Sequence, residues 1–382
     1  MKASAVEPKA FALQVPDADI ADLKDRLTRT RWPDEPPIEP WSTGSSVTYM
    51  KELCEHWRTR FDWRTWEAKL NSFTQFTVPV GGIDLHYLHV PGKKPDAPPL
   101  LISHGWPGSV FEFHKIIPLL TEDFTVIAPS LPGFTLSFKP GQKRFGVEEI
   151  ADVYAALMQD VLGYKRFAVQ GGDWGCFVAS VMGHRYPELV TGIHLNMLAV
   201  RRDPSMLASP TPEEARYLKQ LSNFLKEEMG YQWIQGTRPQ TLSFGLTDSP
   251  AGLAAWIAEK FRAWTDCEGV IENAVNRDEM LANISLYWFT GAIGSSFWPY
   301  YARMHGPWPI PEGQTVDVPT GYAEFPKEIL SPPRSLAAKT YTDIRRWSTM
   351  AKGGHFAALE QPEALAREVR EFFRKLRASP AR

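Results

Sequence analysis

The sequence predicts an α/β fold with a mostly parallel, twisted β-sheet and helices on both faces. Between residues 73 and 199, short apolar runs such as PLLISH, FTVIAP and RFAVQG alternate with helical stretches. Such alternation is typical of buried parallel strands joined by amphipathic helices. A long helical stretch follows, and strand-like segments return as VPTGYAEF (318–325) and RRWSTM (345–350). We therefore expect one sheet that is interrupted by a helical insertion.

This pattern divides the chain into four segments. Residues 1–72 are rich in Pro and Trp but have too few regular elements for a core, so they are predicted to be an N-terminal extension that wraps around the core. Residues 73–199 form the first part of the core, residues 200–308 a helical lid, and residues 309–382 the second part of the core. A lid at this point would lie over the carboxyl ends of the strands, where open α/β sheets bind ligands.

The predicted lid contains helical stretches at 212–229, 250–264 and 278–301. Aromatic residues make up 12% of the chain, with 14 tryptophans, and many of them fall between residues 231 and 308. An apolar pocket wall and ordinary core packing explain such a concentration almost equally well.

Composition excludes several classes of protein. The 382 residues are 43% hydrophobic and 23% charged, as in ordinary globular proteins. A formal charge of -2 without a basic block argues against nucleic acid or an anionic membrane as partner. No apolar run has the length of a membrane span or a signal peptide, and the three cysteines are widely spaced. We therefore expect a cytoplasmic protein.

Asp173 is the candidate nucleophile. It lies in the run Gly171-Gly172-Asp173-Trp174-Gly175, directly between a predicted strand and a predicted helix. Glycines on both sides permit the sharp, strained turn that exposes one side chain, as in the nucleophile elbow, where esterases carry serine. The alternative interpretation is that Asp173 only caps the following helix.

A second loop, from His104 to Gly108 (HGWPG), follows another predicted strand. Such a loop can direct backbone N–H groups into a site, and its Trp106–Pro107 bond is a candidate for the cis form. The N–H groups of Trp106 and Trp174 would then form a two-donor oxyanion hole. The alternative is an ordinary turn, and His104 itself is expected to be structural.

His355 follows the last predicted strand and a pair of glycines, so it is the candidate base, in the chain order nucleophile, acid, histidine. The acid should follow an earlier strand of the late sheet, and Glu328 lies just past the strand-like segment at 318–325. Asp343 is the competing acid, but it is close to His355 in sequence and precedes the last strand.

Taken together, these motifs resemble the microsomal-type epoxide hydrolases, which have the α/β-hydrolase fold. The resemblance covers nearly the whole chain and rests on HGWPG, LPGFTLS (131–137), GGDWG, LYWFTG (286–291), FPKE and GGHFAALE (353–360). We expect this chain to lack the N-terminal membrane anchor of the mammalian microsomal enzyme. The family implies two lid tyrosines that bind the epoxide oxygen.

The family positions fall on Tyr231, in the first lid segment (229–233), and on Tyr300, ten residues beyond the Thr-Gly of LYWFTG, with Tyr301 as the neighbouring alternative and Tyr287 expected in the core. The resemblance also suggests that the bulky aromatic residues Trp233, Phe244, Trp288 and Trp298 line a pocket for a lipophilic or aromatic epoxide. It implies no cofactor and no metal, and the sequence has no HExxH, P-loop or Rossmann glycine pattern. The sequence leaves the oligomeric state open, with a homodimer as one alternative.

The chemistry expected of these residues has two steps. Ionised Asp173 opens the epoxide and becomes an ester, while the tyrosines protonate the ring oxygen. His355, oriented by Glu328, then activates water, which hydrolyses the ester to give a vicinal diol. Two alternatives stay open: a haloalkane or haloacid dehalogenase with the same Asp–His–acid set, in which Trp174 would hold the halide, and a binding module without turnover.

Overall fold

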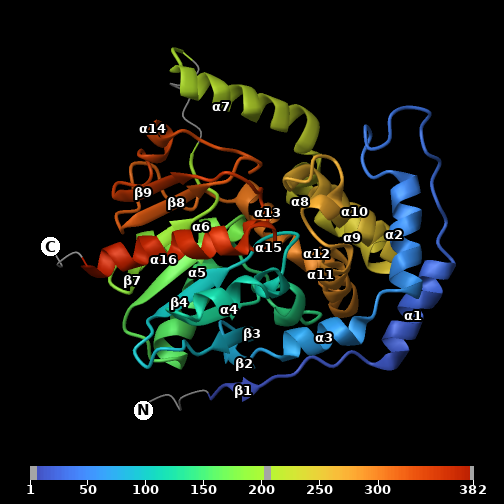
Figure 1. Ribbon diagram of the computed structural model, residues 1–382, viewed down its shortest axis with the longest axis horizontal. Coiled ribbons are helices and arrows are strands. Elements are labelled where there is room, and N and C mark those ends of the chain that lie inside the picture. Colours follow the sequence, from blue (N-terminus) through green and yellow to red (C-terminus); the bar gives the residue numbers. More distant parts are fainter. Residues whose placement is uncertain (1–6, 202–207, 379–382) are drawn as a thin grey trace.

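The computed structural model describes residues 7–201 and 208–378, and within them one nine-stranded sheet forms the centre of the molecule (Figure 1). The strands follow the order β1-β2-β3-β5-β4-β6-β7-β8-β9. Their bounds are β1 Lys9–Ala10, β2 Gln75–Val80, β3 Ile83–Val90, β4 Pro99–Ser103, β5 Thr125–Pro129, β6 Phe167–Gly171, β7 Val190–Leu195, β8 Thr320–Glu324 and β9 Ile344–Thr349. From β5 to β9 along this order every pair is parallel, whereas β1, β2, β3 and β5 pair antiparallel. The α/β fold with a mostly parallel sheet is therefore confirmed.

Alternation along the strands explains why both faces of the sheet are covered. In β4, Leu101 belongs to one hydrophobic cluster, whereas Leu100 and Ile102 belong to another on the opposite face. Successive side chains of a strand point to opposite faces, so a strand of apolar residues alone requires helices on both. The first cluster includes residues of α5 (Val147–Ala156) and α6 (Trp174–Arg185), and the second includes residues of α4 (Ile116–Leu120) and α16 (Pro362–Ala378).

Between β7 and β8 the chain forms a series of helices, which we call the helical insertion. Among the described residues they are α7 Pro212–Asn223, the π-helix η5 Phe224–Glu228, α8 Gly230–Thr237, α9 Pro239–Asp248, α10 Pro250–Trp264, the short 3-10 helix η6 Ile271–Asn273, α11 Arg277–Thr290, α12 Ile293–Ser296 and α13 Trp298–His305. The stretch predicted as one helix at 278–301 is divided, because Gly291 adopts a left-handed conformation (φ 65°) that ends α11. The predicted lid boundary near residue 200 adjoins residues 202–207, which lie outside the described residues.

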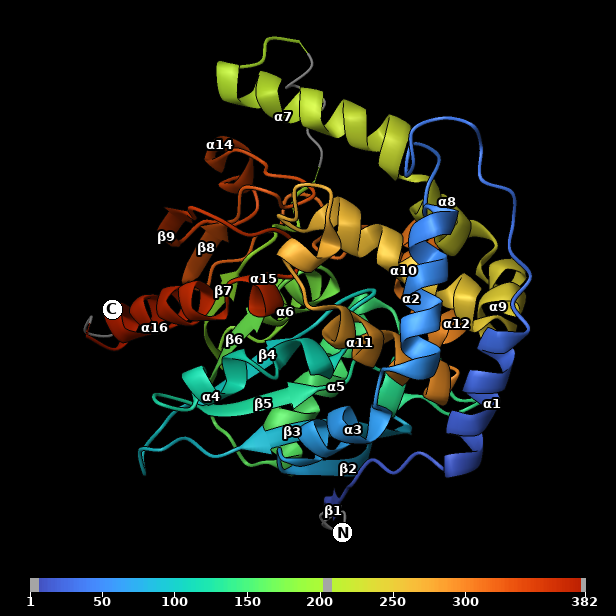
Figure 2. The same ribbon diagram turned by 45° about the vertical axis from the view of Figure 1, so that its right-hand side comes forward.

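The N-terminal residues join the sheet edge to the helical insertion. β1 pairs with β2, and α1 (Asp17–Thr28), α2 (Val47–Thr59) and α3 (Trp63–Asn71) follow it. Figure 2 shows α1 and α2 beside the insertion helices. The Trp57 indole N–H donates to the Ser285 hydroxyl at 2.9 Å, and Arg26 forms an ion pair with Asp248 at 2.8 Å. These contacts fix the helical insertion from the side opposite to β8 and β9.

Among the described residues, no helix combines the length and the apolar composition that crossing a membrane requires.

Candidate active site

Asp173 stands at a sharp turn between β6 and α6. Its backbone has φ 48° and ψ -128°, a conformation that residues other than glycine rarely adopt. The turn also needs glycine on both sides, because a Cβ on Gly171 would lie 2.2 Å from the carbonyl oxygen of Gly175. A Cβ on Gly175 would lie 2.1 Å from the carbonyl oxygen of Ser103, the last residue of β4. Close packing therefore holds Asp173 in this strained position.

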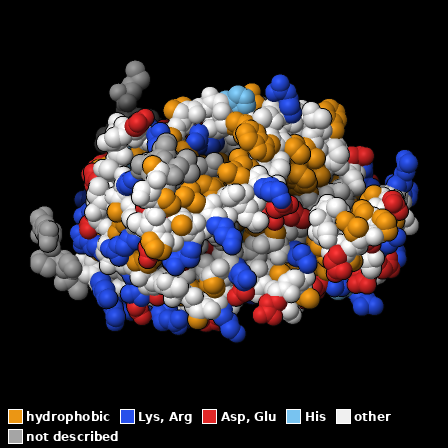
Figure 3. Space-filling view, turned by 90° about the horizontal axis from the view of Figure 1, so that it is seen from above, with side chains coloured by type: hydrophobic (Ala, Val, Ile, Leu, Met, Phe, Trp, Pro, Cys, Tyr) orange, Lys and Arg blue, Asp and Glu red, His pale blue; other side chains and the backbone are white. Residues whose placement is uncertain are grey.

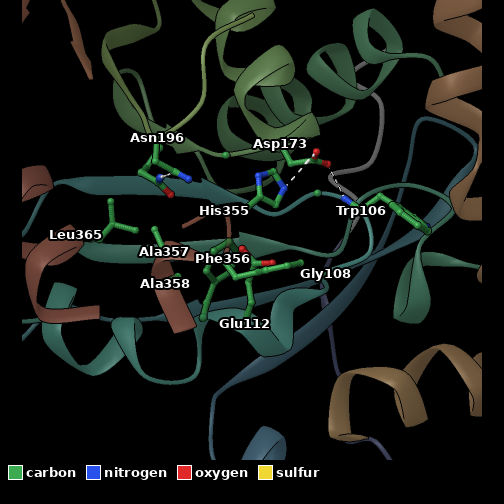
Figure 4. Close-up of a pocket in the computed structure, with 14 residues that line it drawn as sticks. Trp106, Gly108, Glu112, Asp173, Asn196, His355, Phe356, Ala357, Ala358 and Leu365 are labelled. Carbon is green, nitrogen blue, oxygen red and sulfur yellow. Dashed lines mark hydrogen bonds and ion pairs between the residues drawn. The ribbon is translucent and has the colours of Figure 1, made fainter. Parts of the chain in front are cut away.

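The two carboxylate oxygens of Asp173 have different surroundings (Figure 4). Oδ1 accepts a hydrogen bond from the backbone N–H of Trp106 at 2.7 Å, in a loop whose Trp106–Pro107 bond is cis. Oδ2 lies 3.5 Å from Nε2 of His355. The other predicted donor, the N–H of Trp174, is at the first position of α6, where it has no acceptor within the helix. One oxygen is thus held by backbone and the other is available to react.

His355 is placed by Glu328. Nδ1 of His355 lies 2.7 Å from Oε1 of Glu328, which also accepts the backbone N–H of Ile329 at 2.7 Å. The side chains of His355 and Glu328 are only 2% and 0% exposed. The competing acid, Asp343, instead forms an ion pair with Arg345 at 2.8 Å. The structure therefore brings Glu328, and not Asp343, to the histidine.

Opposing influences act on the charge of His355. Burial lowers the pKa of the imidazole, but the carboxylates of Glu328 and Asp173 outweigh it, and together they hold the pKa of His355 well above its ordinary value. The two carboxylates therefore favour the protonated imidazole, and the charge of Asp173 is part of this effect. Loss of that charge would remove one of the two causes that raise the pKa of His355.

Tyr231, on α8, and Tyr300, on α13, meet above the nucleophile. The ring of Tyr231 stacks on that of Trp106 with centroids 5.4 Å apart, and Tyr300 meets the edge of Trp174 at 4.7 Å. The two tyrosine rings are 5.7 Å apart. Burial raises the pKa of both tyrosines, and the charge of Asp173 adds to this effect, so both hydroxyls keep their protons at neutral pH.

The neighbouring tyrosines have other contacts. Tyr301 turns away and stacks on Trp298 at 4.9 Å and His305 at 4.0 Å. Tyr287 donates its hydroxyl to the carbonyl of Gly108 at 2.7 Å, which stabilises the loop that carries Trp106. The hydroxyl of Tyr300 has no hydrogen-bond partner among the described residues, whereas that of Tyr231 accepts from Gln232 at 2.9 Å.

A cavity of about 630 Å³ opens on the nucleophile. Its lining is mostly apolar and includes Phe177, Met197, Leu198, Val200, Phe224, Met229, Trp308, Ile329 and Leu330, together with Asp173, Tyr231 and Tyr300. Figure 3, which views the molecule from the α7 side, shows hydrophobic side chains gathered over part of that face. Several lining residues, such as Phe177, Met229 and Ile329, lie within four residues of a catalytic candidate in the sequence. Closeness to these candidates could therefore have identified pocket residues, whereas the size of a side chain could not.

None of the four aromatic residues predicted to line the pocket belongs to this lining. The prediction is wrong for Trp233 and Phe244, which are 54% and 74% exposed. Trp233 and Trp298 are two residues from Tyr231 and Tyr300, respectively, on the same helices, which turns each tryptophan about 200° away from the tyrosine. The Trp288 ring instead faces the guanidinium of Arg26, 5.8 Å from its centroid.

Within residues 7–201 and 208–378, no group of three or more His, Cys, Asp or Glu side chains is arranged to hold a metal ion. The polar groups around Asp173 are instead a histidine, a second carboxylate and two phenols, which together can move protons around a nucleophilic oxygen.

Comparison with known proteins agrees with this fold. Residues 8–113 match the family described as the epoxide hydrolase N terminus, and residues 98–251 match the alpha/beta hydrolase fold. Epoxide hydrolase 1 of Oryctolagus cuniculus is 37% identical over 406 aligned residues, which cover 95% of this chain and 88% of that protein.

Two solved structures are similar over almost their entire length. Juvenile hormone epoxide hydrolase from the silkworm Bombyx mori has 31% identity and a TM-score of 0.88, covering 98% of this chain and 95% of its own. Epoxide hydrolase from Aspergillus niger has 31% identity and a TM-score of 0.85, covering 97% of both chains. The fold and the site define an α/β hydrolase. More narrowly, the chain belongs to the epoxide hydrolase family.

Proposed function

We propose that this enzyme converts a lipophilic or aromatic epoxide to a vicinal diol through a covalent ester of Asp173. One observation carries the proposal: Oδ1 of Asp173 is held by the N–H of Trp106, while Oδ2 stays available beneath two buried phenols. The mostly apolar lining of the cavity supports a lipophilic substrate, since such walls exclude water and bury apolar surface.

In the first half-reaction, Oδ2 attacks a ring carbon and the carbon–oxygen bond of the epoxide breaks. A carboxylate suits this step because it is already charged, so no base has to remove a proton first. The departing oxygen takes a proton from Tyr231 or Tyr300, and hydrogen bonds from both phenols stabilise its developing charge. The products are an ester of Asp173 and a tyrosinate.

In the second half-reaction, esterified Asp173 no longer carries the charge that helped to keep His355 protonated. The pKa of His355 then falls, and its proton restores the phenol. The neutral imidazole next accepts a proton from water, which attacks the carboxyl carbon, and the oxygen in the hole becomes negative. Collapse releases the diol, which takes up the carboxyl proton, and leaves Asp173 ionised and His355 protonated, as at the start.

Dehalogenation of a haloalkane or haloacid is the second candidate. Its supporting observation is that the indole N–H groups of Trp106 and Trp174 are buried without a hydrogen-bond partner among the described residues, so they could hold a halide. Two buried phenols favour the epoxide, because a departing oxygen needs a proton and a halide does not. Chloride release from a chloroalkane, compared with diol formation from styrene oxide, separates the two activities.

The decisive experiment follows one turnover with styrene oxide in heavy-oxygen water. We expect the label in the Asp173 carboxylate and unlabelled oxygen in the first diol. His355→Ala should stop after one turnover and leave one adduct per protein, Asp173→Asn should form none, and the control His305→Ala, an exposed histidine on α13, should turn over normally. Solvent oxygen in the first diol would mean that water attacks the epoxide directly, and the covalent mechanism would fail.

A further inference from the structure

A second, much smaller cavity lies against the catalytic residues (Figure 4). Its volume is about 20 Å³, which is enough for one water molecule. Asp173 is the residue that lines both this cavity and the large apolar one. The small cavity also touches His355, and its other polar side chains are Glu112, Gln170 and Asn196. It thus offers polar partners for water at the nucleophile, apart from the space expected to receive the epoxide.

Glu112 is the ionisable group in this cavity that the mechanism has not yet used. It belongs to the short helix η1 (Val110–Phe113), which follows the loop of Trp106, and Figure 4 shows its side chain extending toward His355. Gln170 donates to Asn196 at 2.8 Å, so these two amides partly satisfy each other. The Glu112 carboxyl interacts electrostatically with His355 and Asp173, and it accepts no hydrogen bond from a described residue.

The chain leaves room for this carboxyl. A Cβ on Gly108 would lie 2.1 Å from Oε2 of Glu112, so the absence of a side chain at residue 108 keeps the place of the carboxyl free. Burial raises the pKa of Glu112 to about 8; His355 opposes this shift and Asp173 adds to it. At neutral pH the free enzyme therefore holds Glu112 largely protonated, and esterification of Asp173 removes one cause of the raised pKa.

We propose that Glu112 binds and orients the water that hydrolyses the Asp173 ester, an inference that rests on the covalent mechanism above. The water donates one hydrogen bond to Nε2 of His355 and the other to a carboxyl oxygen of Glu112, which directs its lone pair at the carboxyl carbon of Asp173. The new carbon–oxygen bond forms as His355 takes the first proton. The second proton stays on the new oxygen until the tetrahedral intermediate collapses.

This role predicts an effect on one half-reaction only. In Glu112→Leu, ester formation should stay within about threefold of wild type, whereas ester hydrolysis should slow about 100-fold, because the water loses its orientation. The adduct then accumulates, and kcat and KM fall together with little change in kcat/KM. Glu112→Gln should hydrolyse the ester within about tenfold of wild type, since its amide oxygen still accepts a hydrogen bond from water.

Both rates are measured by rapid mixing with styrene oxide, acid quenching and intact-protein mass. The packing control is Ile117→Val, which changes a buried apolar residue of α4 in the same hydrophobic cluster as η1 but outside the lining of the cavity, and it should alter neither rate. Gly108→Ala is a second variant that keeps the carboxyl group of Glu112: its new Cβ displaces this carboxyl, so ester hydrolysis should again be the slower step.

Three outcomes would overturn the inference. Unchanged ester hydrolysis in folded Glu112→Leu and Gly108→Ala would show that the water does not depend on Glu112. Equal slowing of both half-reactions would show that Glu112 supports only the local structure. Failure to detect an adduct in wild type or His355→Ala would instead remove the covalent mechanism itself, and this inference with it.

Discussion

Replacing Gly105 with alanine should displace the nucleophile without touching its chemistry. A Cβ at residue 105 would lie 2.1 Å from Oδ1 of Asp173, and ordinary van der Waals contact begins at 3.4 Å. The carboxylate or the loop must therefore move by 3.4 − 2.1 = 1.3 Å. The hydrogen bond of 2.7 Å between Oδ1 and the N–H of Trp106 orients the carboxylate and thereby places Oδ2, the attacking oxygen, and a misplacement of about 1 Å costs about 100-fold in rate. We expect ester formation to slow by about this factor.

The assay is the single-turnover rate of Asp173 adduct formation with styrene oxide in Gly105→Ala. Gly245→Ala is the matched control, because nothing lies within 4 Å of a Cβ there and the residue is exposed on α9. Both variants should melt within a few degrees of wild type. If Gly105→Ala forms the ester at the wild-type rate, the position of Oδ1 does not control the attack and the reasoning from this contact is refuted.

Two further predictions concern the phenols and the stability of the fold. Tyr300→Phe should slow ester formation about 100-fold, since it removes one of two donors to the departing oxygen. Tyr301→Phe is the control in the same burst assay, and an equal loss in this variant would contradict the assignment of Tyr300 as a donor. Glu368→Gln should lower the free energy of unfolding at pH 7 by about 2 kcal/mol, because Glu368 accepts two hydrogen bonds from Arg346 at 2.7 and 2.8 Å. Burial raises the pKa of Glu368, but Arg346 outweighs it and lowers the pKa below the usual 4.5, so this stability is present above pH 4.5 and is lost as pH falls further. Urea unfolding at pH 7 and pH 3 should therefore show a difference between wild type and variant that shrinks in acid.

The sheet could be predicted because its signal is local. The central parallel strands β4, β5 and β6 are short, mainly apolar runs, and burial on both faces requires that composition. The turn at Asp173 could also be predicted from the sequence, because close backbone approach and a positive φ restrict which residues can stand beside it. Chain order then pointed to His355 and Glu328, which the structure places 2.7 Å apart.

The side-chain directions that depend on the rotation of a helix could not be predicted from the sequence. Trp233 has the bulk expected of a pocket wall, yet it points to solvent because Tyr231, two residues earlier, points inward. A break at Gly291 also changes the rotation of the following helix, and periodicity across the whole stretch could not reveal it. Glu112 was missed for another reason. An acidic residue four positions after Gly108 is typical of the exposed face of a helix, and only the fold brings it into the wall of the small cavity.

Lys260 places a buried positive charge beside one of the proposed proton donors. Its side chain is 5% exposed, and its Nζ lies 4.6 Å from the ring centroid of Tyr231 and 2.5 Å from a carboxylate oxygen of Glu259. When Tyr231 gives up its proton, negative charge appears on the phenol, and the Coulomb attraction of a buried cation at this distance stabilises that charge by about 2 kcal/mol. Lys260→Met keeps the apolar stem and removes the charge.

We therefore expect ester formation in Lys260→Met to slow about 30-fold, the factor that corresponds to about 2 kcal/mol. Ester hydrolysis should not change, because Tyr231 has regained its proton before water attacks. The control Lys226→Met removes an exposed lysine that pairs with Glu227 and should leave both rates unchanged. If Lys260→Met slows hydrolysis and spares ester formation, the cation acts on the second half-reaction, and Tyr231 is not the phenol whose charge it stabilises.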